Sequence, residues 1–171
     1  MLLTGFFALM RLGELTDPDT TSLRDPRKQI RRLSVTVSND NYSFFLSGHK
    51  GNKFFEGNTI IVPCSTNSHN AYRHFTSYLN SCDIKFPAAS SLWLRNNGTI
   101  PTRMWFMWRL RMFFDKTVGG QLLRAGGATL LAETGTPPHL IQASGRWKMD
   151  TFEIYIQKHP VLLQALLFAR Q

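Results

Sequence analysis

Residues 121–129 read QLLRAGGAT, and they are followed by GRW at residues 145–147 and then by Tyr155. This order places an arginine, an indole N–H donor and a phenol along one short segment of helical character. The set suits attack on a phosphodiester, because a phenol can act as a nucleophile and a guanidinium can bind the anionic oxygens. A second arginine lies near the other end of the chain, in the sequence RLGEL at residues 11–15. These two segments decide the interpretation of the fold.

The composition is that of a globular chain with an excess of positive charge. The chain has 171 residues, of which 43% are hydrophobic, so we expect one domain with a core of ordinary size. It carries 20 Lys and Arg residues against 11 Asp and Glu residues, which gives a net charge of +9 and a pI near 10.1. Such a charge indicates a polyanionic partner, most often nucleic acid.

Neither the cysteines nor the apolar segments indicate a zinc site or a membrane anchor. Only Cys64 and Cys82 occur, without a Cys/His cluster, which favours a reducing compartment. No apolar run approaches the roughly 20 residues that a bilayer span needs. Residues 1–10 lack the basic start of a signal peptide and are typical of the middle of a core helix, so we expect the chain to begin inside one. We therefore expect an intracellular protein with no membrane partner. With nucleic acid as its partner, the expected location is the nucleus.

The first half of the chain predicts a helix and then a small antiparallel sheet. Residues 1–15 carry a helical pattern that stops at the turn signal of residues 16–19, and a basic stretch follows. Alternation places Leu33, Val35 and Val37 on one face of a first strand. The remaining sheet segments are a turn at 39–41, a strand at 42–46, a turn at 48–53 and a strand at 58–63.

The second half of the chain predicts a series of helices. Thr66 or Ser68 can cap the first of them, whose apolar stripe is Ala71, Phe75, Tyr78 and Leu79. The other expected helices are 102–115, 121–134, 138–144, 150–157 and 161–169. The aromatic residues within 102–115 are expected to be core residues. The last helix is apolar on nearly all sides, so it must be buried, either in this subunit or in a neighbour.

The motifs at residues 11–15, 121–129 and 145–155 resemble those of the catalytic domain of tyrosine recombinases (phage-integrase type). The sequences RAGGAT (residues 124–129) and GRW (residues 145–147) most resemble those of the mobile-element branch, the Crypton-like and DIRS-like recombinases. The resemblance implies an α+β fold, mainly α with a small antiparallel three-stranded β-sheet, and one catalytic domain over residues 1–171. It also implies that the helical DNA-clamping domain that precedes this domain in the family is missing.

The resemblance implies DNA breaking and rejoining without a metal, nucleotide or other cofactor. In the family a tyrosine attacks the scissile phosphate and forms a 3′-phosphotyrosyl link, and a free 5′-hydroxyl later reverses the step. Tyr155 is the candidate nucleophile, because it lies 31 residues after Arg124, close to the family's interval. The partners implied are double-stranded DNA and a homotetramer assembled on paired sites.

The remaining catalytic roles are carried over to matching positions of this chain. Arg11 and Arg124 occupy the two arginine positions that bind the phosphate, and Glu14 is the acidic residue that orients the site. The general acid is a lysine at the tip of a β-hairpin, where Lys50 is preferred and Lys53 is the alternative.

Two positions of the active-site motif remain open or depart from the family. Trp147 lies 23 residues after Arg124, where the family has histidine or tryptophan, but Arg146 fits the interval to Tyr155 better. Gln121 stands where the family has the histidine of His-x-x-Arg. Glutamine cannot shuttle a proton near neutral pH, so we expect slower chemistry, or none.

Further arginines are expected to contact DNA outside the catalytic site. They are Arg31, Arg32, Arg103, Arg109 and Arg111. Two other functions remain as alternatives. One is a catalytically dead DNA-binding remnant of a mobile element. The other is a helix-turn-helix regulator built on residues 121–144, which is disfavoured because residues 139–143 after the turn are mostly apolar.

Overall fold

The structure, a computed structural model, describes residues 1–47, 57–64 and 70–168. The helices are α1 (Leu2–Phe7), α2 (Leu12–Leu15), α3 (Ala71–Lys85), α4 (Arg103–Leu110), α5 (Gly120–Glu133), α6 (Pro138–Gly145), α7 (Met149–Gln157) and α8 (Pro160–Phe168). The strands are β1 (Thr36–Val37), β2 (Asn41–Leu46) and β3 (Asn58–Pro63), and three short 3-10 helices precede them, at Thr21–Leu23, Pro26–Lys28 and Arg32–Ser34.

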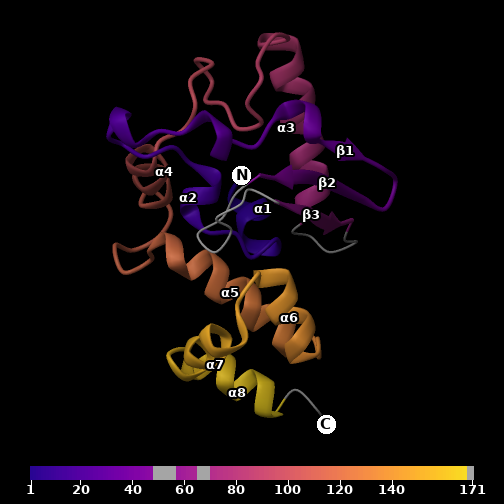
Figure 1. The fold of residues 1–171 in the computed structure, drawn as a ribbon, viewed down its shortest axis with the longest axis vertical. Helices are drawn as coiled ribbons and strands as arrows, with labels where there is room; N and C mark the ends of the chain where they lie inside the picture. The colour runs from indigo at the N-terminus through magenta and orange to yellow at the C-terminus, as the bar shows by residue number, and fades with distance from the viewer. Residues whose placement is uncertain (48–56, 65–69, 169–171) are drawn as a thin grey trace.

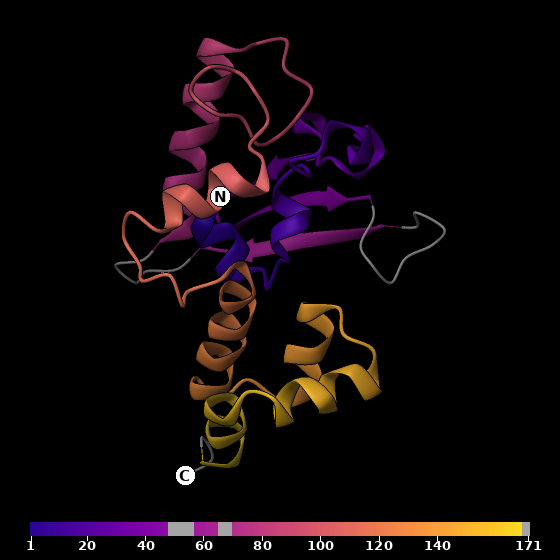
Figure 2. The same cartoon turned by 90° about the vertical axis from the view of Figure 1, so that its left-hand side faces the viewer.

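The elements form two halves that α5 connects. The sheet and helices α1 to α4 lie together in the upper half of Figure 1, and α6, α7 and α8 lie in the lower half. Figure 2 shows α5 running from one half toward the other. The predicted fold class, mainly α with a small antiparallel three-stranded sheet, is confirmed. None of the helices in the described part of the chain is both long and apolar enough to cross a bilayer.

The sheet has the strand order β1-β2-β3, and both pairings are antiparallel. Strands β2 and β3 agree with the prediction to within one residue. The first strand is much shorter than predicted, because residues 32–34 form a 3-10 helix in which the Ser34 hydroxyl donates to the Arg31 carbonyl. Leu33 therefore lies outside the strand and is 97% exposed, so the prediction that it shares one strand face with Val35 and Val37 was wrong.

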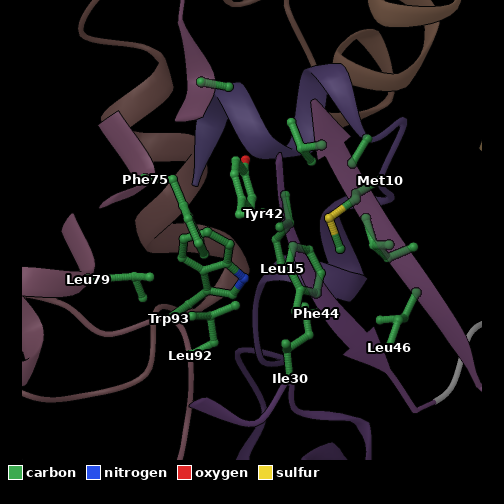
Figure 3. Packing of buried hydrophobic residues seen from close by; sticks show 14 residues of the cluster. Met10, Leu15, Ile30, Tyr42, Phe44, Leu46, Phe75, Leu79, Leu92 and Trp93 are labelled. Atoms are coloured by element: carbon green, nitrogen blue, oxygen red, sulfur yellow. The ribbon is translucent and has the colours of Figure 1, made fainter. Parts of the chain in front are cut away.

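The upper core lies between the sheet and α3, as Figure 3 shows. Alternation along β2 buries Tyr42, Phe44 and Leu46, because successive side chains of a strand point to opposite faces. The Tyr42 ring stacks on Phe75 of α3 with 3.8 Å between centroids. Its hydroxyl shares a hydrogen bond of 2.9 Å with Thr4 of α1, so the N-terminal helix is tied to the sheet.

Helix α3 has the apolar stripe that its sequence predicts, with Ala71, Phe75 and Leu79 buried. Its N-cap is Asn70, whose side chain accepts a hydrogen bond from the Arg73 backbone N–H at 3.1 Å. The predicted cap at Thr66 or Ser68 was therefore wrong, and those two residues lie outside the described residues.

The single helical segment predicted over residues 1–15 is broken in two. Helix α1 ends at Phe7, and Leu9 adopts a left-handed φ of 48°, which a helix cannot contain. The break leaves the carbonyl oxygens of Ala8 and Leu9 free to accept hydrogen bonds from Arg146, which is 138 and 137 residues away in sequence, respectively. Arg11 then becomes the N-cap of α2 rather than an interior helical residue.

The expectation that the aromatic residues within 102–115 belong to the core was wrong in part. Around α4 only Phe106 and Leu110 are buried, whereas Trp108 and Phe113 are 57% and 76% exposed. Helix α4 is short and presents one face to Leu12 and Leu123, which leaves its opposite face uncovered. In α8, Leu162 is fully buried but Val161, Leu163, Leu167 and Phe168 are exposed, so within this chain α8 is buried on one side alone.

The close crossing of α1 and α5 predicts a strong effect of a small substitution. A Cβ at Gly127 would overlap the carbonyl oxygen of Phe6 and the side chain of Leu9. We expect Gly127→Ala to lower the free energy of unfolding by about 2 kcal/mol, since backbone atoms must move apart. Gly13→Ala is the control, because nothing lies within 4 Å of its added Cβ. Denaturant unfolding compares the two variants, and equal stabilities would contradict the packing described.

Candidate active site

The buried carboxylate of Glu14 is the centre of the site. Its side chain is 5% exposed and accepts hydrogen bonds from two arginines. Oε1 accepts from Arg11 Nη1 at 2.9 Å, while Oε2 accepts from the Arg11 backbone N–H and from Arg146 Nη2, each at 2.9 Å. Arg11 can take this position because it precedes the first turn of α2, three residues before Glu14.

Arg146 connects the C-terminal helices to the N-terminal ones. It follows α6 in the left-handed conformation with φ of 55°, and its side chain turns inward. Besides Glu14, the guanidinium donates to the carbonyl oxygens of Ala8, Leu9 and Ser144 at 3.4, 3.3 and 3.0 Å. Most of its donors are therefore engaged within the protein.

Arg124 lies on α5 with 5% of its surface exposed. Its guanidinium carbon sits 4.2 Å from the centre of the Trp147 ring, and both Nε and Nη2 are buried without a hydrogen-bond partner. Burial, followed by the positive charge of Arg11, lowers the pKa of Arg124 to about 10, which leaves it protonated at neutral pH. These donors are available to an anion, because hydrogen bonds from a guanidinium to anionic oxygens are among the strong ones.

Tyr155 completes the cluster from α7. Its ring centroid lies 4.6 Å from that of Trp147, and its hydroxyl is buried without a hydrogen-bond partner. Burial raises the pKa of the phenol to about 12, while the positive charge of Arg124 acts in the opposite direction. The nearby guanidinium thus favours the phenolate that a nucleophile must become.

His159 belongs to the cluster but was missed in the sequence. Its ring lies 4.1 Å from that of Tyr155, centroid to centroid. Its Nδ1 is 2.7 Å from the Tyr155 carbonyl oxygen, which can only accept, so Nδ1 carries the proton. The spacing of four residues between Tyr155 and His159 could have predicted their contact, because this spacing brings side chains together on a helical turn.

Of the other predicted catalytic residues, Gln121 lies within the described part of the chain. Gln121 is exposed on the first turn of α5, three residues before Arg124. Lys50 and Lys53 lie outside the described residues.

The predicted DNA-binding arginines divide into two groups. Arg103, Arg109 and Arg111 are exposed on or just after α4. Arg31 is exposed beside the sheet, whereas Arg32 pairs with Asp83 of α3, with 2.9 Å between Nε and Oδ1. Arg32 is therefore the least available of these five for a phosphate.

The charges of the cluster suit a phosphodiester. Arg11, Arg124 and Arg146 contribute three positive charges and Glu14 one negative charge, so these four side chains are net positive. Guanidinium groups remain charged and match the geometry of phosphate oxygens. Among the described residues no group of three or more His, Cys, Asp or Glu side chains is placed to hold a metal ion.

Comparison with known proteins identifies the fold. The structure superimposes on XerH site-specific recombinase bound to difH substrate in a pre-cleavage complex, with a TM-score of 0.60 and 18% sequence identity over 90% of this chain. The post-cleavage complex of XerH with palindromic difH substrate gives a TM-score of 0.60 and 19% identity over 99% of this chain. The fold is that of a tyrosine-recombinase catalytic domain.

The similarity covers part of each recombinase chain and is not seen at the level of sequence families. This chain matches 41% and 45% of the two solved recombinase chains, which is less than half the length of either. No protein-family model matches the sequence, and no curated protein matches it significantly. At 18–19% identity the similarity to the tyrosine-recombinase fold rests on structure rather than on sequence.

The role of Glu14 in holding the site predicts a large loss of stability in Glu14→Ala. The variant leaves Arg146, whose side chain is 7% exposed, as an uncompensated buried charge. We expect the free energy of unfolding to fall by about 3 kcal/mol. Asp83→Ala, which removes the partner of Arg32 at the surface, should cost less than about 1 kcal/mol. Denaturant unfolding measures both, and a small effect of Glu14→Ala would contradict the assignment.

Proposed function

We propose that this chain breaks and rejoins double-stranded DNA through a covalent 3′-phosphotyrosyl intermediate on Tyr155. The proposal rests on two neighbouring polar groups in one buried cluster that lack hydrogen-bond partners. Two N–H donors of the Arg124 guanidinium have no partner, and the Tyr155 hydroxyl beside it has no partner either. A phosphodiester between them would receive hydrogen bonds from the first and nucleophilic attack from the second. The tyrosine-recombinase fold supports the same reaction.

The proposed reaction balances as a transesterification. The Tyr155 oxygen forms a bond to phosphorus and passes its proton to solvent water, while the bond from phosphorus to the 5′-oxygen of the next nucleotide breaks. The departing 5′-oxygen takes up a proton from a general acid, for which Lys50 is proposed and Lys53 is the alternative. The energy of the broken ester is kept in the new one, so a second 5′-hydroxyl can reverse the step without a cofactor.

The arginines would stabilise the transition state. A pentacoordinate phosphorus gathers negative charge on its non-bridging oxygens, and preorganised guanidinium donors are most effective where such charge develops. Arg124 is buried against Trp147, and Arg11 is fixed by two hydrogen bonds to Glu14. Trp147 holds both Arg124 and the Tyr155 ring, and Arg146 supports the site through Glu14.

A DNA-binding protein without cleavage activity is the second candidate function. The position of Gln121 favours it, because glutamine cannot exchange a proton with the reacting groups near neutral pH. The side chain is also exposed rather than packed in the cluster. Such a remnant would keep the basic surface and its salt-dependent affinity for DNA.

Two further features of the chain support proposals about its evolutionary origin and its assembly. The sequence motifs RAGGAT and GRW support descent from a Crypton-like or DIRS-like mobile element. Such an origin implies that the protein acts in the nucleus. The exposed apolar side chains of α8, among them Val161, Leu167 and Phe168, support assembly with further copies, a homotetramer on paired sites.

Covalent trapping on a modified duplex tests the proposal. The chain is incubated with a pool of duplexes that carry 5′-bridging phosphorothiolates, whose thiol leaving group needs no general acid and does not rejoin. We expect a protein–DNA adduct that resists denaturation, because Tyr155 attacks irreversibly. Denaturing gel electrophoresis measures the yield.

Two variants control the trapping experiment. Tyr155→Phe should give no adduct, whereas Tyr72→Phe, which alters a tyrosine of α3 outside the cluster, should leave the yield unchanged. Salt-sensitive binding to the same duplexes without any adduct would instead support the DNA-binding remnant.

Replacement of Gln121 tests why the chemistry is expected to be slow. Gln121→His introduces a group that can exchange protons near neutral pH, so we expect adduct formation on the phosphorothiolate duplexes to accelerate by at least about tenfold. Gln121→Asn is the matched control and should not accelerate the reaction. Single-turnover rates with each variant measure the effect, and an unchanged rate in Gln121→His would show that this position does not limit the chemistry.

A further inference from the structure

Helix α4 has an apolar row on the face that points away from the protein. Met104 and Trp108 are exposed, and their spacing of four residues places them along one side of the helix. Met112 is exposed in the turn after α4. Phe113 and Phe114 extend this row in the turn that follows, and both are exposed. A surface helix normally has polar residues on its outer face, so the row is available to a partner.

Cationic side chains surround this row. The exposed ones are Arg103, Arg109, Arg111 and Lys116. The Arg109 guanidinium carbon lies 5.8 Å from the centre of the Trp108 ring, and Nη1 is 3.7 Å from the sulfur of Met112. The nearby acids, Asp19 and Asp115, accept hydrogen bonds from backbone N–H groups of α4 and of the following turn. The charge of this surface therefore suits a polyanion.

The surface lies directly beside the candidate active site. The inner face of α4, through Phe106 and Leu110, packs on Leu12 and Leu123. Leu12 follows Arg11 in the chain, and Leu123 precedes Arg124. Figure 1 shows α4 next to α2. A helix with its side chains is about 10 Å wide, so DNA with a phosphate at the two arginines would pass the outer face of α4.

We propose that the outer surface of residues 103–114 binds unpaired DNA bases next to the cleaved phosphate, an inference that rests on the proposed strand-exchange function. After cleavage the strand with the free 5′-hydroxyl must leave its complement before it can attack another strand, so its bases lose their stacking partners. Aromatic rings with neighbouring arginines replace such stacking in proteins that bind single strands, whatever the base. Trp108 and Phe113 supply the rings, and Arg103, Arg109 and Arg111 supply the phosphate contacts.

Fluorescence anisotropy with a labelled oligothymidylate of about 15 nucleotides, within the range of single-strand site sizes, tests the proposal. We expect Trp108→Ala to weaken binding of this single strand by about tenfold, since each stacked base contributes on that scale. Binding of a labelled duplex of the same length should change by less than about twofold, because paired bases are not available for stacking. Ile84→Ala, which removes an exposed apolar side chain of α3, should leave both affinities unchanged.

A second variant separates stacking from charge. Arg109→Ala should weaken binding of both the single strand and the duplex and should reduce the salt dependence of each, since it removes a phosphate contact. The salt dependence of Trp108→Ala should equal that of the unaltered chain.

Three results would overturn the proposal. They are equal affinities of Trp108→Ala and the unaltered chain for the single strand, an equal loss of affinity for single strand and duplex, and self-association of the chain that Trp108→Ala abolishes. The last would assign the surface to a protein partner. The assay involves no covalent step, so its failure is distinct from that of the proposed function, which the adduct on Tyr155 tests.

Discussion

The buried ion pair between Glu14 and Arg146 is the interaction on which the rest of the site depends. It joins residues 132 positions apart in sequence, at a separation of 2.9 Å between Arg146 Nη2 and Glu14 Oε2. Without the carboxylate, the guanidiniums of Arg11, Arg124 and Arg146 would lie close together in a poorly solvated region and would repel one another. With it, Arg11 and Arg146 are held in fixed positions and the Arg124 guanidinium keeps unpaired donors for an anion. The cluster therefore keeps a net positive charge that can bind an anion.

The backbone around this interaction carries strain that local sequence does not explain. Leu9 and Arg146 are the two non-glycine residues of the described chain with positive φ, and Arg146 Nη2 donates to the Leu9 carbonyl at 3.3 Å. Each conformation costs roughly 1–2 kcal/mol for a residue with a side chain. Strained residues of this kind persist where the surrounding structure determines them, and they often accompany functional sites. These two conformations bring the Leu9 carbonyl, after α1, and the Arg146 side chain, after α6, together next to the Glu14 carboxylate.

Much of the fold was predictable because its boundaries are marked by local signals. Gly119 and Gly120 begin α5, Gly135 ends it with a φ of 78°, and Pro137 and Pro138 begin α6. The break at Leu9, the 3-10 helix at residues 32–34 and the uncovered face of α4 were not predictable in this way. Each depends on tertiary contacts, and the sequence alone predicted a longer helix, a longer strand and a buried row of aromatics.

The site shows the same division between local and tertiary information. The order of Arg11, Arg124, Trp147 and Tyr155 along the chain predicts a cluster, and the structure brings these four together. The alternatives Arg146 and Trp147 could not be separated from spacing, because only the direction of each side chain distinguishes them. Arg146 turns toward Glu14, and Trp147 lies between Arg124 and Tyr155.

Mass-spectrometric mapping of the residue that becomes linked to DNA tests whether a phosphodiester binds between Arg124 and Tyr155 and is attacked by the tyrosine. After reaction with a phosphorothiolate duplex, nuclease digestion and proteolysis, we expect one modified peptide, with a nucleotide attached through its 3′-phosphate to Tyr155. A nucleotide on any other residue, or a chain that binds these duplexes and remains unmodified, would contradict it.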